Sequence, residues 1–329
     1  MKSYISPLRL SLAGGGTDVP PFSEEFGSHV VNFAIQKYVN ISIKPGEKES
    51  KPPLRLTLKN HRNQVQIRDS FVEKLEQSLN QSFAPEKPIE IEVLNPVKPS
   101  SGLGTSSSII VSILKALDDY FDRNSDSLEL VSEAIRIERN KMGILGGFQD
   151  YFPAIYGGLN SIKFSQRDQW AITRIEVSEK VRMFLEESIF AFELGIKRNS
   201  QQVVKDQMKR ASIHNSVTQS ALIEQLQIAA ALLDALREGK INDIIDLVEN
   251  SYIQKKKFSP LITNDYIDDI EFKLRAKGAR GIKVSGAGGG GHMFCFFPSG
   301  MPKDLLKELP SNISILRVKL DQAGFRKLS

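Results

Sequence analysis

Cysteine is almost absent from this chain of 329 residues, which contains only Cys295. A single cysteine excludes an intrachain disulfide, and it gives no basis for a cysteine-based metal site. Chains without disulfides are typical of reducing compartments, so the sequence indicates an intracellular protein. The four histidines are scattered without the spacing of metal ligands, and we assign no metal to them.

Long apolar runs and a strong charge imbalance are also missing. The longest apolar stretches, such as residues 228–233, are far shorter than the roughly 18 residues that a membrane span needs. Pro7 and Arg9 interrupt the region where a signal peptide would need its apolar core. The net charge of +5 suits a protein that handles anions but is too small for a dedicated nucleic-acid binder. We therefore expect a cytoplasmic protein without a membrane or nucleic-acid partner.

Composition and hydrophobic periodicity predict an α+β fold. At 40% hydrophobic and 25% charged residues the chain is ordinarily globular, and its length corresponds to about two domains. Alternating apolar residues predict strands, and apolar stripes at helical spacing predict helices. Strands are expected at 4–13, 38–44, 54–58, 89–94, 159–164, 171–177, 189–194, 281–285, 292–297 and 313–319. Helices are expected at 106–121, 127–142, 201–214, 217–237, 241–254 and 263–277. We place the two domains at 1–180 and 181–329.

One carboxylate lies on an apolar helix stripe. In the helix predicted over 127–142, Glu138 shares one face with Val131, Ile135 and Met142. Because a buried carboxylate is costly unless it is paired, Glu138 is expected to be paired or functional.

Glycine occurs at an average frequency but is concentrated in three stretches at junctions between elements. These are residues 12–18 (LAGGGTD), 99–108 (PSSGLGTSSS) and 283–291 (KVSGAGGGG). In the second stretch, Gly102 and Gly104 allow close backbone approach, and a hydroxyl run leads into a helix. Exposed amides at a helix N-terminus form an anion site, although a serine-rich helix cap after a flexible turn is the alternative. No Walker A sequence occurs in the chain.

The third stretch contains a GxGxxG pattern formed by Gly286, Gly288 and Gly291. A dinucleotide-binding fold requires a helix after this pattern, whereas the bulky run at 292–297 predicts a strand. We therefore reject the dinucleotide fold and expect a glycine-rich hairpin packed against another loop or a phosphate.

Asp150 is the leading catalytic candidate. It lies between glycines and aromatic residues in the segment 143–152, and a helix cap is its alternative role. Together with Glu138 and the anion site, it indicates a site for magnesium and phosphates, because Mg²⁺ binds few carboxylate or hydroxyl ligands plus nucleotide phosphates. An aspartate close to an acceptor hydroxyl commonly acts in phosphoryl transfer.

The three stretches, in this order and over almost the whole chain, resemble the motifs of the GHMP small-molecule kinases. Residues 99–108 are similar to the second family motif and residues 283–291 to the third. The first motif departs from the galactokinase form, because Gly15 and Gly16 replace the acid and the histidine that contact the hexose. This departure disfavours galactose and leads us to expect room for a larger sugar. The AGGGTDxPP form is similar to bacterial D-glycero-D-manno-heptose 7-phosphate kinases and also to fucokinases.

The resemblance implies an ATP site between an N-terminal α+β domain with a mixed sheet and a ferredoxin-like C-terminal domain. Asp150 would be the catalytic aspartate, and Arg9, on the sugar side, would complete the catalytic set. Mg²⁺ would be held by Ser106 and Glu138. The nucleotide phosphates would bind Pro99, Ser101, Gly102, Leu103, Gly104, Thr105, Ser106 and Ser107. The sugar would be met by Asp18, Gly15, Gly16 and Thr17, and the third motif, with Gly286, Gly288, Gly289 and Gly290, would stabilise the phosphate loop.

The implied reaction is ATP-dependent phosphorylation of the anomeric hydroxyl of a heptose 7-phosphate, for GDP-heptose and surface glycan synthesis. Arg198 is the candidate partner of the 7-phosphate, with an ordinary solvated basic loop as the alternative. A fucokinase-like sugar 1-kinase and a non-catalytic protein of the same fold are the other hypotheses. We expect a small-molecule substrate and a monomer or a homodimer. Lys255, Lys256 and Lys257 are interpreted as a solvated end of a helix.

Overall fold

The structure, a computed structural model, describes residues 1–47, 51–65, 69–83, 85–98, 100–165, 169–196 and 199–328. Its first sheet is built on a long hairpin of β1 (Lys2–Ala13) and β2 (Ser28–Pro45), which pair antiparallel. The path of the sheet is β11-β1-β2-β4-β3, and β5 (Leu159–Phe164) joins β2 and carries β6 (Trp170–Arg174). The remaining members are β3 (Leu54–Lys59), β4 (Ile89–Leu94) and β11 (Arg326–Lys327). The parallel pairing of β3 with β4 makes this a mixed sheet, as the family resemblance implies.

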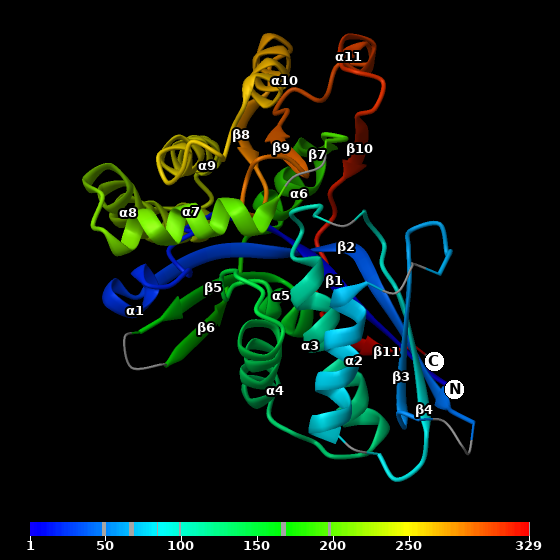
Figure 1. Ribbon diagram of the computed structural model, residues 1–329. Helices are drawn as coiled ribbons and strands as arrows, with labels where there is room; N and C mark the ends of the chain where they lie inside the picture. Colours follow the sequence, from blue (N-terminus) through cyan, green and yellow to red (C-terminus); the bar gives the residue numbers. More distant parts are fainter. Residues whose placement is uncertain are drawn as a thin grey trace.

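Helices cover both faces of the first sheet (Figure 1). On one face, α3 (Thr105–Tyr120) and α5 (Tyr151–Tyr156) contact β1. On the other face, α8 (Ser216–Glu238) contacts β1 and β2, and α9 (Ile241–Lys256) contacts β1. The elements α1 (Phe22–Phe26), α2 (Ser70–Phe83), α4 (Ser127–Ile135) and a π-helical turn η1 (Arg136–Lys141) belong to the same half.

The second sheet is antiparallel, in the order β10-β7-β9-β8. Its strands are β7 (Ile189–Glu193), β8 (Arg280–Val284), β9 (His292–Phe296) and β10 (Ser314–Arg317). Its neighbours are α6 (Glu179–Ser188), α7 (Ser200–Ser212), α10 (Asp265–Ala276) and α11 (Leu305–Glu308). Because α9 contacts both β8 and β1, the two sheets are joined through this helix. The α+β class with two sheets is confirmed, whereas the boundary at residue 180 stays a prediction.

Three of the longer elements, β2 in its first half, α2 and α6, are missing from the elements expected from the sequence. The first half of β2 is buried on both faces from Ser28 to Ile35, so it lacks the alternation of a half-exposed strand. The helix α6 has a sparse apolar stripe, with Val181 and Leu185 as its buried apolar residues. The helix α2 buries Val72, Leu75 and Leu79 at helical spacing, a pattern that the prediction misses. No helix in the described part of the chain combines the length and the apolarity of a membrane span.

Candidate active site

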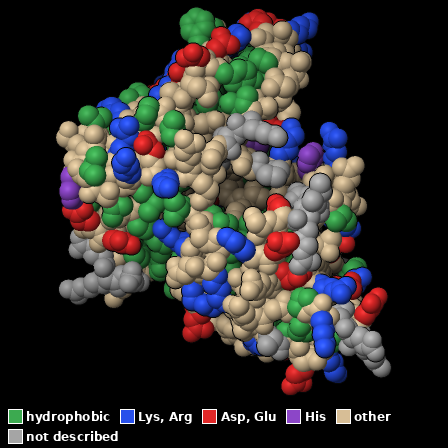
Figure 2. Space-filling model, in the orientation of Figure 1, with side chains coloured by type: hydrophobic (Ala, Val, Ile, Leu, Met, Phe, Trp, Pro, Cys, Tyr) green, Lys and Arg blue, Asp and Glu red, His purple; other side chains and the backbone are tan. Residues whose placement is uncertain are grey.

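The glycine-rich segments meet around a cavity of about 400 Å³ between the two sheets. Figure 2 shows the hollow between the upper and lower parts of the molecule. Its walls are formed by β1 and the loop after it, the start of α3, the segment before α5, the end of α9 and the loop after β8. The three segments that resemble family motifs therefore converge on one space although they lie far apart in the sequence.

The loop before α3 has the geometry of an anion site. Gly102 and Gly104 have φ values of +82° and +75°, and Gly104 is the N-cap of α3. Such φ values favour glycine, because a Cβ would be strained there. The side chain of Ser101 lies 3.1 Å from the hydroxyl of Thr105, which holds the loop in its turn.

Most of the residues predicted to bind phosphates line the cavity, namely Ser101, Gly102, Gly104, Thr105, Ser106 and Ser107. Leu103 differs, because its side chain is fully buried in the core. Its backbone carbonyl accepts a bond from the Arg9 amide, which ties the loop to β1. Pro99 lies outside the described residues.

Arg9, which is buried, and Asp150, which is partly exposed, form an ion pair beside this loop. The Arg9 Nε and Nη2 atoms lie 2.8 and 2.7 Å from Asp150 Oδ1, and Nη1 donates to the carbonyl of Gly102 at 2.6 Å. A Cβ on Gly104 would lie 3.2 Å from the Asp150 carboxyl group, so this glycine lets the aspartate and the loop approach each other. Any phosphate bound at the start of α3 would therefore lie close to the Asp150 carboxylate.

Glu138 is almost completely buried and accepts three hydrogen bonds. Its donors are Ser106 Oγ at 2.6 Å, Ser107 Oγ at 2.7 Å and Tyr151 Oη at 2.5 Å. Burial raises the pKa of Glu138, while the three hydroxyls oppose that change. The paired carboxylate on the apolar stripe thus lies where the sequence predicts, at a turn of π-helix rather than in a continuous α-helix.

The donor set at Glu138 suits a divalent cation. A serine hydroxyl and a carboxylate lie at the entrance of an anion-binding loop, which is the kind of set that Mg²⁺ shares with nucleotide phosphates. Among the described residues, no cluster of three or more His, Cys, Asp or Glu side chains forms a metal site. Phosphate oxygens would therefore have to supply further ligands.

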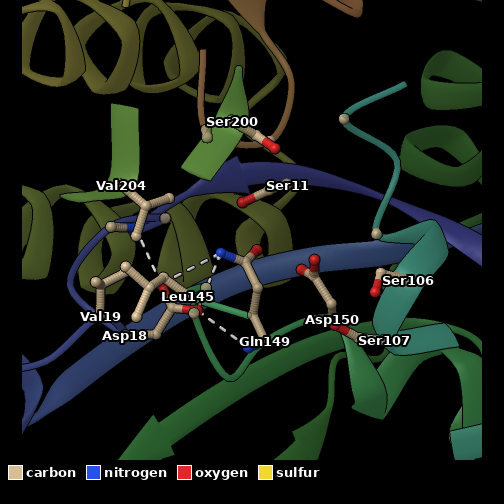
Figure 3. A pocket seen from close by; sticks show the side chains of 18 of the residues that line it. Ser11, Asp18, Val19, Ser106, Ser107, Leu145, Gln149, Asp150, Ser200 and Val204 are labelled. Carbon is tan, nitrogen blue, oxygen red and sulfur yellow. Dashed lines mark hydrogen bonds between the residues drawn. The ribbon is translucent and has the colours of Figure 1, made fainter. Parts of the chain in front are cut away.

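Asp18 organises the loop after β1. Its carboxylate accepts bonds from the backbone amides of Gly16 at 2.9 Å and Gln149 at 3.0 Å, and the Gln149 side-chain amide lies 3.3 Å from it. Figure 3 shows Gln149 between the carboxyl groups of Asp18 and Asp150. A Cβ on Gly147 would collide with Asp18 Oδ2, so only glycine fits opposite this aspartate.

Gly15 and Gly16 both line the cavity, but the space at their own Cβ positions is taken by neighbouring side chains. A Cβ on Gly15 would lie 3.1 Å from both Ser11 Oγ and Gln149 Nε2. A Cβ on Gly16 would lie 2.7 Å from the ring of Phe258. Ser11, Gln149 and Phe258 therefore pack closely against the two glycines, and room for a larger sugar stays a prediction.

Two further residues are predicted to contact the sugar phosphate. One of them does not line the cavity, and the other lies outside the described residues. Thr17 is fully buried, and its hydroxyl donates to the carbonyl of Gly14 at 2.8 Å, so it holds the turn and does not line the cavity. Arg198, the predicted partner of a sugar phosphate, lies outside the described residues.

The loop after β8 contacts the phosphate loop directly. Ser285 Oγ donates to the carbonyl of Gly102 at 2.8 Å, and His292 Nδ1 lies 2.8 Å from the carbonyl of Ser101. A Cβ on Gly291 would lie 2.5 Å from that same Ser101 carbonyl. The antiparallel pairing of β8 with β9 bears out the rejection of a dinucleotide fold.

The glycines of this loop have different neighbours. Gly286 lines the cavity. A Cβ on Gly288 would press against Ile262, and the Gly289 amide donates to the Ile262 carbonyl at 2.7 Å. Gly290 has a φ of +142° and does not line the cavity.

The sequence analysis assigns no role in binding to four side chains that line the cavity: Ser11, Gln149, Lys255 and Lys283. Ser11 Oγ and Gln149 Oε1 are buried and have no hydrogen-bond partner in the described part of the chain. Side chains alternate between the two faces of β1, so Ser11 lies on the same face as Arg9. This spacing could have indicated Ser11 as a residue of the cavity wall. The interpretation of Lys255 as part of a solvated helix end is wrong, because it is 6% exposed.

Comparisons with known proteins agree with this geometry. The N-terminal domain of GHMP kinases matches residues 68–158, and the C-terminal domain matches residues 232–313, which together cover just over half of the chain. The chain is 25% identical to a D-glycero-alpha-D-manno-heptose 7-phosphate kinase of Campylobacter jejuni, over 92% of this chain and 91% of that protein. It is 24% identical to a bifunctional fucokinase/GDP-fucose pyrophosphorylase of Arabidopsis thaliana, over 87% of this chain and 29% of that protein.

Among solved structures, the chain resembles one described as a D-glycero-D-manno-heptose 1-phosphate kinase from Bacteroides thetaiotaomicron. The TM-score is 0.77 at 23% identity, covering 100% of this chain and 99% of the other, which shows a shared fold. The matches to both family domains, with the three motif segments gathered around one cavity, identify the enzyme class. The chain belongs to the GHMP kinase family and is a phosphotransferase.

Proposed function

We propose that the protein transfers the terminal phosphoryl group of ATP to the anomeric hydroxyl of D-glycero-D-manno-heptose 7-phosphate. The product would be the 1,7-bisphosphate, a precursor of GDP-heptose for surface glycans. The observation that carries the proposal is the Arg9–Asp150 pair held against Gly104 at the start of α3. This arrangement brings a carboxylate to the place where phosphates would bind.

The nucleotide phosphates would bind the amides and hydroxyls from Ser101 to Ser107. Positive φ values at Gly102 and Gly104 turn this backbone into the cavity, and the α3 dipole adds favourable charge. Mg²⁺ would be held by Ser106 and Glu138 and would supply charge neutralisation on the phosphates. Tyr151, which donates to Glu138, would fix the orientation of that carboxylate.

The acceptor hydroxyl would be oriented by Asp150, which would take its proton as the bond to phosphorus forms. Arg9 would keep the Asp150 carboxylate in place and would stabilise negative charge on the transferred group. Ser11 Oγ and Gln149 Oε1, which lack a partner among the described residues, lie on the Asp18 side of the cavity, and the hydroxyl-rich face of a sugar would satisfy them. This polar wall supports a sugar rather than an apolar alcohol as acceptor.

The heptose is supported by the names of two similar proteins. Both names specify a heptose phosphate, and they differ in the position of the phosphate. The second candidate is a fucokinase-like sugar 1-kinase, which the similarity to the Arabidopsis protein favours. A non-catalytic role is disfavoured by the intact contacts among Arg9, Asp150 and the phosphate loop.

A coupled assay of ADP release over a panel of sugars and sugar phosphates tests the proposal. Heptose 7-phosphate should give the highest kcat/KM, and phosphorus NMR should place the new phosphate on the anomeric carbon. Fucose as the best acceptor would favour the second candidate. ADP release that is the same with and without every sugar would contradict both.

A further inference from the structure

Two buried lysines, one at the end of α9 and one in β8, form a cationic wall of the cavity. Lys255, at the end of α9, donates from Nζ to the carbonyl of Val284 at 3.0 Å and to that of Gly286. Lys283, in β8, donates from Nζ to the carbonyl of Leu12 and to Ser251 Oγ, both at 2.8 Å. Both side chains are buried and both line the cavity.

Positive charges gather at this wall. Lys283 has no carboxylate within 4.0 Å in the described ranges, and the charges acting on it are those of Lys255 and Arg9. Burial first, and then these two cations, hold the pKa of Lys283 well below its usual range. Buried like charges repel one another, so an anion that enters the cavity would relieve this repulsion.

The two arginines of the cavity differ from Lys283, because carboxylates act on both arginines. Arg9 is paired with Asp150. Arg139 donates to the carbonyl of Gly146 at 2.8 Å, stacks over the Phe148 ring and feels the charges of Asp18 and Glu138. The surroundings of Lys283 are cationic instead, so the lysine wall is the better place for an additional anion.

The wall also lies next to the phosphate loop. Lys255 bonds to the carbonyl of Gly286, and the preceding residue, Ser285, bonds to the carbonyl of Gly102. Both carbonyls belong to the end of β8 and the loop after it, so these bonds hold the ammonium group beside the segment that contacts the phosphate loop. A phosphate is the anion that such a site would recognise in a phosphotransferase.

We infer that Lys255, supported by Lys283, binds a phosphate group inside the cavity. This inference rests on the proposed function and deepens it, because it assigns a recognition site for phosphate on the wall of the second sheet. The group is the terminal phosphate of the nucleotide or the phosphate ester of the sugar, which share the same chemistry.

Binding of inorganic phosphate to the full chain saturated with ADP and Mg²⁺ tests the site without turnover. ADP fills the phosphate loop, so added phosphate reports on the rest of the cavity. Calorimetry should show Lys255→Met binding phosphate at least about tenfold more weakly than the wild type, since a charged hydrogen bond is lost. The control is Lys257→Met, which removes an exposed charge whose amine bonds to Gln254. Equal phosphate affinity in the two variants would overturn the inference.

A second measurement covers the case in which Lys255→Met does not fold. The wild type labelled with ¹³C at the lysine Cε atoms is titrated with phosphate, and the Lys255 signal is assigned by its absence from Lys255→Arg. A shift of that signal on phosphate binding supports the site, and an unmoved signal overturns it.

Kinetics then distinguish the two sources of the phosphate. A rise in KM confined to phosphorylated acceptors assigns the group to the sugar. A fall in kcat/KM for ATP that is equal with phosphorylated and unphosphorylated sugars assigns it to the nucleotide. If the wild type binds phosphate but phosphorylates no sugar of the panel, the proposed function fails while the phosphate site stands.

Discussion

Two loops of similar composition meet at the cavity, and each leads into a different kind of element. The loop of residues 100–104 leads into α3, so its free amides can face a ligand. The loop of residues 285–291 leads into β9, and its Ser285 and Gly291, with the adjoining His292, contact the first loop. The element after a glycine-rich segment therefore decides whether the segment binds a ligand or supports one that does.

The largest effect is expected at the carboxylate that faces the first loop. Asp150→Asn should lower kcat by at least about 100-fold, the scale of a positioned base, while ATP binding stays nearly unchanged. Steady-state kinetics and calorimetry with ATP measure the two quantities. An unchanged kcat would remove Asp150 from the mechanism and would leave the first loop as a binding element alone.

A smaller effect is expected at the proposed metal carboxylate beside the first loop. Glu138→Gln removes the negative charge while keeping the size of the side chain, so the Mg²⁺ concentration for half-maximal activity should rise at least about tenfold. ATP binding without Mg²⁺ should change little. An unchanged Mg²⁺ requirement would show that Glu138 only orders the serines and Tyr151.

The supporting loop is tested by Gly291→Ala. At φ +81° a Cβ would collide with the Ser101 carbonyl, so we expect a loss of stability of about 2 kcal/mol and a severalfold weaker affinity for ATP. Gly300→Ala is the matched control, because Gly300 has a similar φ of +84° with open space around its Cβ position. Thermal unfolding and ATP titration should separate the two variants; equal ATP affinity would mean that the second loop does not support the first.

The smallest effect is expected at Ser285→Ala. The carbonyl of Gly102 loses one donor but keeps Arg9 Nη1 at 2.6 Å, so it stays satisfied. The loss should be about 1 kcal/mol, seen as a reduction of ATP affinity of no more than about tenfold. A larger loss would show that the second loop controls the first through this single bond.

Much of the site could be predicted because its signals are local. Glycines at junctions, a hydroxyl run before a helix and a carboxylate on an apolar stripe are all visible in the sequence, and the structure places Gly104, Glu138 and Asp150 around one cavity. The contacts that set pocket shape are not local. Phe258 fills the space beside Gly16 although the two residues belong to opposite halves of the chain, and no spacing rule reports such a contact.

The burial of Lys255 is a second property that depends on contacts distant in the sequence. A run of three lysines at the end of a helix is typically solvated, and Lys257 is indeed exposed. Lys255 is buried because α9 packs between the sheets, which turns this position toward the loop after β8. The sequence alone therefore could not distinguish the buried lysine from its exposed neighbour.

The short strand β11 has a consequence for how the chain can fold. It pairs with β1, so Tyr4 and Ile5 lie opposite Lys327 and Arg326. The chain thus leaves the first sheet after β6, builds the second sheet and then returns to close the first. On the ribosome this pairing must wait until almost the last described residues have emerged. We expect a chain shortened before Leu320 to unfold its first sheet less cooperatively. The truncation should therefore do more than remove a disordered tail.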